Sequence, residues 1–116
     1  MGNATTNNTQ ITINTKYTKL ENLIKEFNKN VQNVKKININ SLEDLKKSQY
    51  IQKIENIQME INNEIIKIRN TVLNSSTNIN EYTKSNIKIK KYIFDIQKVT
   101  QEYFELIRNK SKFYIN

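Results

Sequence analysis

Apolar residues recur at alternating spacings of three and four from Ile51 to Ile107, which is the heptad pattern of a helix that buries one continuous stripe. Thirteen of the seventeen positions in this seam are apolar when tyrosine is counted. The seam therefore predicts coiled-coil packing. The predicted helix-packing interface consists of Ile61, Ile65, Ile68, Val72, Ile79, Tyr82, Ile89, Ile93, Ile96, Tyr103 and Ile107.

A shorter seam precedes the long one, and it consists of Leu20, Ile24, Phe27, Val31 and Val34. The stretch Thr18-Lys19-Leu20-Glu21 fits a capping box, in which the hydroxyl of Thr18 and the carboxylate of Glu21 each accept a backbone N–H. This pattern predicts a helix that starts at Thr18. The two seams are out of phase by one residue, which predicts a break between them.

Two stretches of poor helix formers divide the helical region. At the first, Ser41 offers an N-cap, with Glu43 and Asp44 in the favourable first turn. At the second, residues 74–78 (NSSTN) interrupt the long seam without changing its phase. The helix could run through, but the composition favours a bend in which Asn78 caps a last helix. The predicted helices are therefore about 18–38, 41–74 and 78–114.

The predicted architecture is all-α: elongated helices over 18–116 that form a coiled coil or helical bundle. Residues 1–17 are polar and of low complexity, and we expect them to form a disordered tether. In the last helix, Tyr92, Val99 and Leu106 widen the apolar stripe to about three residues per heptad. This width is typical of bundles of three or more helices, so we expect other small helical chains to complete the core.

Composition narrows the possible chemistry. The 116 residues include no Cys, His or Pro and only one Gly. Thiolate or imidazole metal sites, Cys nucleophiles and His-based acid–base catalysis are excluded. The chain has neither a glycine-rich phosphate loop nor a carboxylate pair beside a base, so it is predicted to be no enzyme and to use no cofactor. No stretch is apolar enough to be expected to cross a membrane.

The formal net charge is +8, which favours anionic partners. Lys84, Lys91 and Lys98 are spaced seven apart on one outer face, which is either a solvated face or a contact for phosphate or lipid headgroups. Nucleic acid is a weaker candidate because there are only two arginines. Asn86 places a polar group in the seam, where it could select register or partner, or simply reflect an Asn-rich composition.

The only glycine is Gly2, and Met1-Gly2 with Thr6 fits the acceptor pattern for N-myristoylation. A small second residue also favours removal of methionine in general, and Met-Gly can be an artefact of cloning. A myristoyl chain alone binds membranes weakly, so a second signal is expected. The predicted membrane-proximal basic residues are Lys16, Lys19, Lys25, Lys29, Lys35 and Lys36.

The stretch Lys91–Val99, KYIFDIQKV, resembles a C-terminal helix of the myrlysin family, and Gly2 fits the myristoylated start of that family. The resemblance covers about a quarter of the chain, and it implies a subunit of the lysosome-positioning complex BORC on the cytosolic face of lysosomes. Such a complex recruits an Arf-like small GTPase. The snapin family is a close second, because Lys47-Ser48-Gln49 before a long seam resembles its middle region.

Two hypotheses of different classes follow. The first is a non-enzymatic subunit of a multi-subunit lysosomal adaptor that is lipidated at Gly2 and peripheral on the membrane. The second is a structural coiled-coil protein without lipid, in a tethering, kinetochore or cytoskeletal complex. A basic nucleic-acid-binding helix pair is a weaker third possibility.

Overall fold

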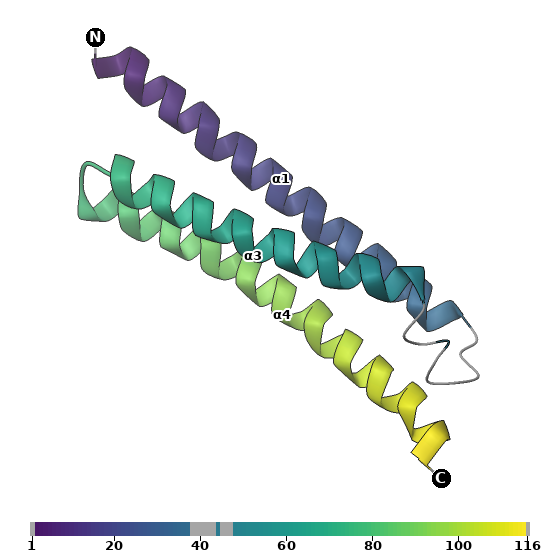
Figure 1. Cartoon of the computed structure of the whole chain (residues 1–116). Coiled ribbons are helices and arrows are strands. Elements are labelled where there is room, and N and C mark those ends of the chain that lie inside the picture. The colour runs from purple at the N-terminus through teal and green to yellow at the C-terminus, as the bar shows by residue number, and fades with distance from the viewer. Residues whose placement is uncertain (1, 38–43, 45–47, 116) are drawn as a thin grey trace.

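A computed structural model describes residues 2–37, 44 and 48–115, with side chains for 13–37, 44 and 48–110. Its three long helices are α1 (Gly2–Lys36), α3 (Gln49–Ser75) and α4 (Ile79–Ile115) (Figure 1). The molecule measures 66 × 21 × 17 Å and has a radius of gyration of 18.3 Å. A compact domain of this length would have a radius of gyration of about 13 Å. The prediction of an elongated, all-α fold is confirmed.

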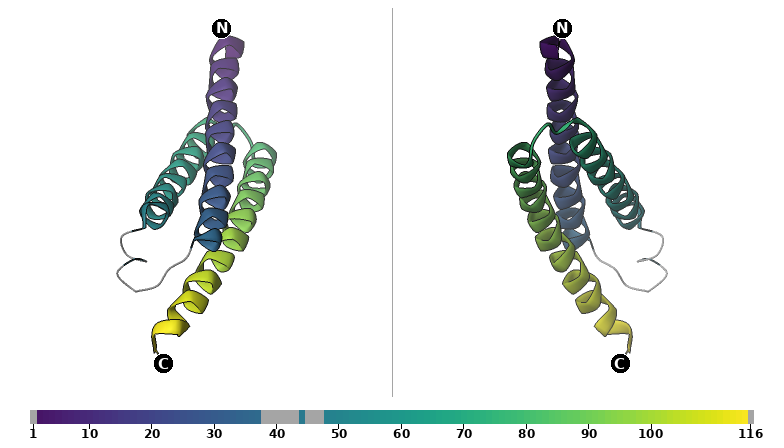
Figure 2. Two further views of the ribbon diagram at one scale, coloured as in Figure 1. Left: turned by 90° about the vertical axis from the view of Figure 1, so that its right-hand side faces the viewer. Right: turned by 90° about the vertical axis from the view of Figure 1, so that its left-hand side faces the viewer.

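The three helices form an up-down-up arrangement. Helices α3 and α4 are antiparallel and joined by a tight connection, while α1 runs in the same direction as α4 (Figure 1). Helix α1 packs mainly on α3 and less extensively on α4. Seen from the side, α3 and α4 diverge from their connection, with α1 running between their projections (Figure 2). The N-terminal end of α1 and the C-terminal end of α4 project at opposite ends of the molecule.

Helix α1 begins well before the predicted start at Thr18. The disordered lead expected over residues 1–17 is helical from Gly2 onwards, and Thr18 lies inside the helix. The Thr18 hydroxyl donates to the carbonyl of Asn14, 3.0 Å away, instead of capping a helix start. The physical reason is burial: Ile13 and Tyr17 are buried and extend the seam of Leu20 backwards at the same spacings of three and four.

The hydrophobic core lies chiefly between α1 and α3. The five residues of the short predicted seam all pack in it, with Ile24 only partly buried. The buried apolar residues are Ile13, Tyr17, Leu20, Leu23, Phe27, Val31 and Val34 from α1; Ile51, Ile54, Ile57, Ile61, Ile68 and Val72 from α3; and Ile89 and Tyr103 from α4. Helix α4 therefore contributes the smallest share of the core.

The start of the second predicted helix differs from expectation. Helix α3 begins at Gln49, after Ser48 in an extended conformation whose side chain makes no capping hydrogen bond. The predicted N-cap Ser41 and its neighbour Glu43 lie outside the described residues. The first turn of α3 contains no acidic residue, so its N-terminus is held by packing of Ile51 and Ile54 and not by a cap or by charge.

The connection between α3 and α4 confirms the predicted break and its cap. The hydroxyls of Ser75 and Ser76 bond back to the carbonyls of Thr71 and Val72, both at 2.6 Å, which competes with continuation of the helix. The side chain of Asn78 then accepts the backbone N–H of Glu81 at 2.9 Å. The chain reverses direction here, however, and this is more than the bend that was expected.

Candidate interaction surface

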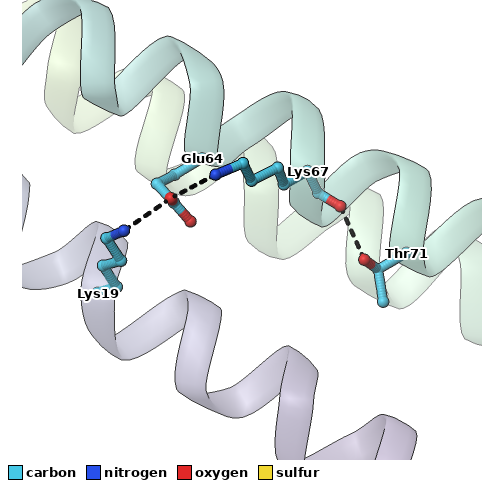
Figure 3. Close-up of polar contacts among 4 residues, drawn as sticks. All are labelled: Lys19, Glu64, Lys67 and Thr71. Carbon is cyan, nitrogen blue, oxygen red and sulfur yellow. Dashed lines mark hydrogen bonds and ion pairs between the residues drawn. The ribbon is translucent and has the colours of Figure 1, made fainter.

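The contact between α1 and α3 includes a charged group that is almost completely buried. The side chain of Glu64 is 5% exposed and pairs with Lys19 of α1 at 3.0 Å and with Lys67 of its own helix at 3.5 Å (Figure 3). Burial opposes ionisation of this carboxyl, but the two ammonium groups outweigh it and hold its pKa below the ordinary value. Glu64 thus fixes α1 against α3 through a pair that the seam analysis did not single out.

The contact between α1 and α4 is aromatic and polar. The rings of Tyr17 and Tyr92 stack with centroids 5.7 Å apart, and the ammonium of Lys88 lies 4.2 Å from the centre of the Tyr17 ring. The hydroxyl of Tyr92 donates to Glu21. Burial, reinforced by the Glu21 carboxylate, raises the pKa of Tyr92, and burial also raises that of Tyr17.

The same contact continues towards the C-terminal end of α1. The Gln32 amide donates to the carboxylate of Glu102 at 3.0 Å, and the ammonium of Lys110 donates to the Ile37 carbonyl at 3.0 Å. These contacts show which side of α4 faces α1. That side includes Lys88, Tyr92 and Glu102.

Large apolar side chains lie exposed on α3 and α4. On α3 they are spaced seven apart, as Met59, Ile66 and Leu73, and form one stripe along the helix. On α4, Ile87 and Phe94 are likewise spaced seven apart. Exposed apolar stripes at this spacing are what a packed neighbouring helix usually covers.

A groove lies at the end of the α3 stripe. It has a volume of about 340 Å³ and lies between α3 and α4 near their connection. Its lining includes Arg69 and Leu73 from α3 and Tyr82, Asn86 and Lys90 from α4, and no residue of α1. Leu73 is the last member of the α3 stripe, and Lys90 lies between Ile87 and Phe94 on α4. We call this surface the α3–α4 face and define it by Met59, Ile66, Leu73, Tyr82, Ile87 and Phe94.

The predicted helix-packing interface is only partly assembled within the chain. Ile61, Ile68, Val72, Ile89 and Tyr103 are buried. Four further members, Ile65, Ile93, Ile96 and Ile107, are partly buried against the core.

Two members of that interface lie outside the core of the chain. Ile79 is 81% exposed and Tyr82 is 39% exposed, because the helix ends at Ser75 and the long seam is folded back on itself there. Asn86 is half-buried in the groove and is not enclosed in a core. On α4 the seam is thus partly buried against the core and partly exposed to solvent.

The predicted basic residues of the first helix differ in their surroundings. Lys19 is paired with Glu64 on the side of α1 that faces α3. Lys16 is partly buried, whereas Lys25, Lys29, Lys35 and Lys36 are exposed along α1. On α4, Lys84, Lys91 and Lys98 are exposed as expected, and the Lys98 ammonium lies 4.8 Å from the centre of the Phe94 ring.

Several packing residues were missed from the sequence. Leu23, Ile57, Asn30 and Glu64 are all buried, and each directly precedes a seam position. In the sequence, an apolar stripe widened by the position before each seam residue was predicted only for the last helix. The signal in the first two helices was available at Leu23 and Ile57, but Asn30 and Glu64 are polar and carry no apolar signal.

Two findings concern metal binding and membrane spans in the described part of the chain. Among the residues that were searched, no three His, Cys, Asp or Glu side chains come together as a possible metal site. A search of the described helices finds none with the length and apolar character to span a bilayer.

In comparisons with known proteins, no protein-family description matches the chain, and no match was found among curated proteins or solved structures.

Proposed function

We propose that the chain is a non-enzymatic helical subunit of an assembly that contains other protein chains. The observation that carries this proposal is the α3–α4 face, where apolar residues at heptad spacing are exposed and a groove at the end of the α3 stripe is lined by no residue of α1. Soluble proteins seldom leave contiguous apolar surface exposed unless it binds something. The elongated shape adds support, because a 66 Å helical rod presents much of its surface to neighbours.

Purification of the tagged chain from its own cells under native conditions tests the proposal. We expect it to co-purify with at least one other helical chain in fixed stoichiometry, and to elute at a mass well above its own 13.8 kDa. A chain that elutes as a monomer from its own cells, melts cooperatively and brings no stoichiometric partner would refute the proposal. Light scattering on the eluted peak separates a true complex from the large apparent size of an elongated monomer.

We extend the proposal to a peripheral adaptor complex on the cytosolic face of lysosomes, with a myristoyl group on Gly2. Support comes from the acceptor pattern at Gly2 and from the resemblance of Lys91–Val99 to myrlysin-type subunits. The exposed lysines of α1, such as Lys25 and Lys29, would add attraction to anionic lipid. The resemblance would also add an Arf-like small GTPase as a partner of the complex.

Intact mass of the chain from its own cells tests the lipid anchor. We expect a gain equal to one myristoyl group after loss of Met1, and we expect Gly2→Ala to lose both the added mass and the lysosomal localisation. An unmodified Gly2 amine would remove the anchor while leaving the assembly proposal intact.

A second candidate is a structural coiled-coil subunit without lipid, in a tethering, kinetochore or cytoskeletal complex. One observation favours it: α1 is helical from Gly2 onwards, so the flexible tether expected between the lipid and the first helix is replaced by helix. The same mass measurement discriminates between the two, because this candidate requires an unmodified N-terminus.

A further inference from the structure

We infer that the α3–α4 face binds an amphipathic helix of another protein, and that the polar flanks of this helix are acidic. The inference rests on the proposed function and deepens it, since it assigns one surface and the chemistry of its partner. The apolar stripes face away from α1, a groove lies at the end of the α3 stripe, and basic side chains surround them.

The two stripes point away from α1. Each residue of a helix is rotated by about 100° from the one before, so residues two apart lie about 200° apart around the axis. On α3, Glu64 faces α1 and Ile66 is two residues later. On α4, Tyr92 contacts α1 and Phe94 is two residues later. Helix α1 therefore cannot cover either stripe in this arrangement.

The shape suits a helix as occupant. Leu73, the last residue of the α3 stripe, lines the groove from α3, and Lys90, a neighbour of Ile87 and Phe94 on the helix surface, lines it from α4. Leu73 lies fourteen residues after Met59 on α3, a rise of about 21 Å, which is the length of a helix of about four turns. A fourth helix between α3 and α4, on the side away from α1, would complete a four-helix bundle.

The charges beside the stripes set the chemistry of the partner. Arg69 and Lys90 line the groove itself, and Lys84, Lys91 and Lys98 are exposed on neighbouring positions of α4. Between residues 79 and 98 five lysines outnumber the two acids, Glu81 and Asp95. Glu81 accepts hydrogen bonds from Thr77 at the start of α4, and Asp95 lies close enough to Tyr92 to help raise its pKa, after burial and Glu21. Carboxylates on the partner would complement this basic surround.

A second copy of the chain fits less well. Two copies that met through this face about a two-fold axis would bring the same surface of each into contact, and with it the lysines of both α4 helices. Like charges facing one another across an interface are unfavourable. A flat lipid surface fits less well too, because apolar residues on both walls of a groove match a rod better than a plane.

A designed peptide tests the inference on the full chain. The probe is a fluorescein-labelled peptide of about 21 residues, with leucine at the two seam positions of each heptad and glutamate on the flanking positions. Its twin carries lysine in place of every glutamate. By fluorescence anisotropy at low salt, we expect the acidic peptide to bind saturably and at least tenfold more tightly than its twin. The difference should shrink as salt is added.

Matched variants of the chain assign the surface. Phe94→Gln should weaken binding of the acidic peptide at least tenfold, whereas Phe104→Gln, a residue of the same type and helix with nearly the same exposure, should change it less than twofold. Lys90→Gln should weaken binding several-fold and Lys29→Gln, on α1, should not. Unchanged circular dichroism and melting of each variant show that the fold is intact.

Several outcomes would overturn the inference. Equal affinity for the two peptides, binding of neither, or equal loss in the two phenylalanine variants would each do so. Binding to phosphatidylserine vesicles that depends on Phe94, without peptide binding, would assign the face to a membrane. A concentration-dependent dimer that Phe94→Gln dissociates would assign it to a second copy. If Phe94→Gln leaves the native complex intact while partners still co-purify, the proposed function stands and this assignment of its surface fails.

Discussion

The packing of α1 against α3 predicts a large difference between two phenylalanines. Phe27 of α1 is fully buried, at 0% exposure, whereas Phe94 of α4 is 57% exposed. Truncation of a buried phenylalanine to alanine costs about 3–5 kcal/mol, because apolar contacts are lost and a cavity remains. Truncation of an exposed one away from special features usually costs no more than about 0.5 kcal/mol.

For a chain of this size the expected total stability is about 6–17 kcal/mol, so the loss at Phe27 is a large fraction of it. Thermal melting followed by circular dichroism should show Phe27→Ala melting at least about 10 °C below the unchanged chain. Phe94→Ala should shift the melting temperature by only a few degrees. Urea titration provides the same comparison at constant temperature. Equal shifts in the two variants, or no shift for Phe27→Ala, would refute the placement of α1 on α3.

Three further predictions concern polar groups. The depressed pKa of Glu64 contributes stability that is present above pH 4.5, its ordinary pKa, and is lost as pH falls through the pKa of the folded state. Glu64→Gln should therefore lower the melting temperature at pH 7. In this variant the melting temperature should also fall less steeply as the solution is acidified. Equal acid dependence in both proteins would contradict this. Asn78→Ala should cost about 1 kcal/mol in urea unfolding, because it removes the cap of α4, while Asn80→Ala serves as the control and should cost less. The raised pKa of Tyr92 contributes stability below pH 10 that is lost as pH rises through the pKa of the folded state. In a titration followed by tyrosinate absorbance, part of the increase should therefore occur well above pH 10, and Tyr92→Phe should remove that part. If the titration curves of Tyr92→Phe and of the unchanged chain coincide well above pH 10, the contact between Tyr92 and Glu21 is contradicted.

Heptad spacing alone predicted most of the helical architecture. The seam from Leu20 to Val34 is buried or partly buried as expected, and the break at residues 74–78 has the predicted Asn78 cap. Both features are local: a helix reports its buried stripe through residues three and four apart, and a cap through residues within one turn. These signals remain informative in a chain rich in Asn and Ile because they depend on the spacing of residues and not on how frequent each residue type is.

The start of α1 was predicted wrongly because its local signals point the other way. Thr18 and Glu21 have the residue types of a capping box, and the residues before them are polar and uncharged. What makes this stretch helical is tertiary: Tyr17 stacks on Tyr92 from a distant part of the chain, and Ile13 is buried. Packing of this kind outweighs weak local propensity, and single-sequence reasoning does not include it.

The candidate surface could be foreseen only in outline. The breadth of the apolar stripe indicated that other helices must cover it, and the structure shows that α1 covers one side of α3 and α4 only. The stripe of Met59, Ile66 and Leu73 is spaced seven apart in the sequence, but it lies outside the main seam. Its exposure follows from where α1 lies, and this depends on pairs such as Lys19 and Glu64 that are forty-five residues apart.

The polar links between α1 and α4 share a nearly constant offset along the chain. Glu21 pairs with Tyr92, Gln32 with Glu102 and the carbonyl of Ile37 with Lys110, at separations of 71, 70 and 73 residues. Repeated isoleucines would match almost as well if one helix slid past its neighbour by seven residues. The polar links would all be broken by such a slide. They therefore select one axial alignment among several of similar hydrophobic energy, at little gain in total stability.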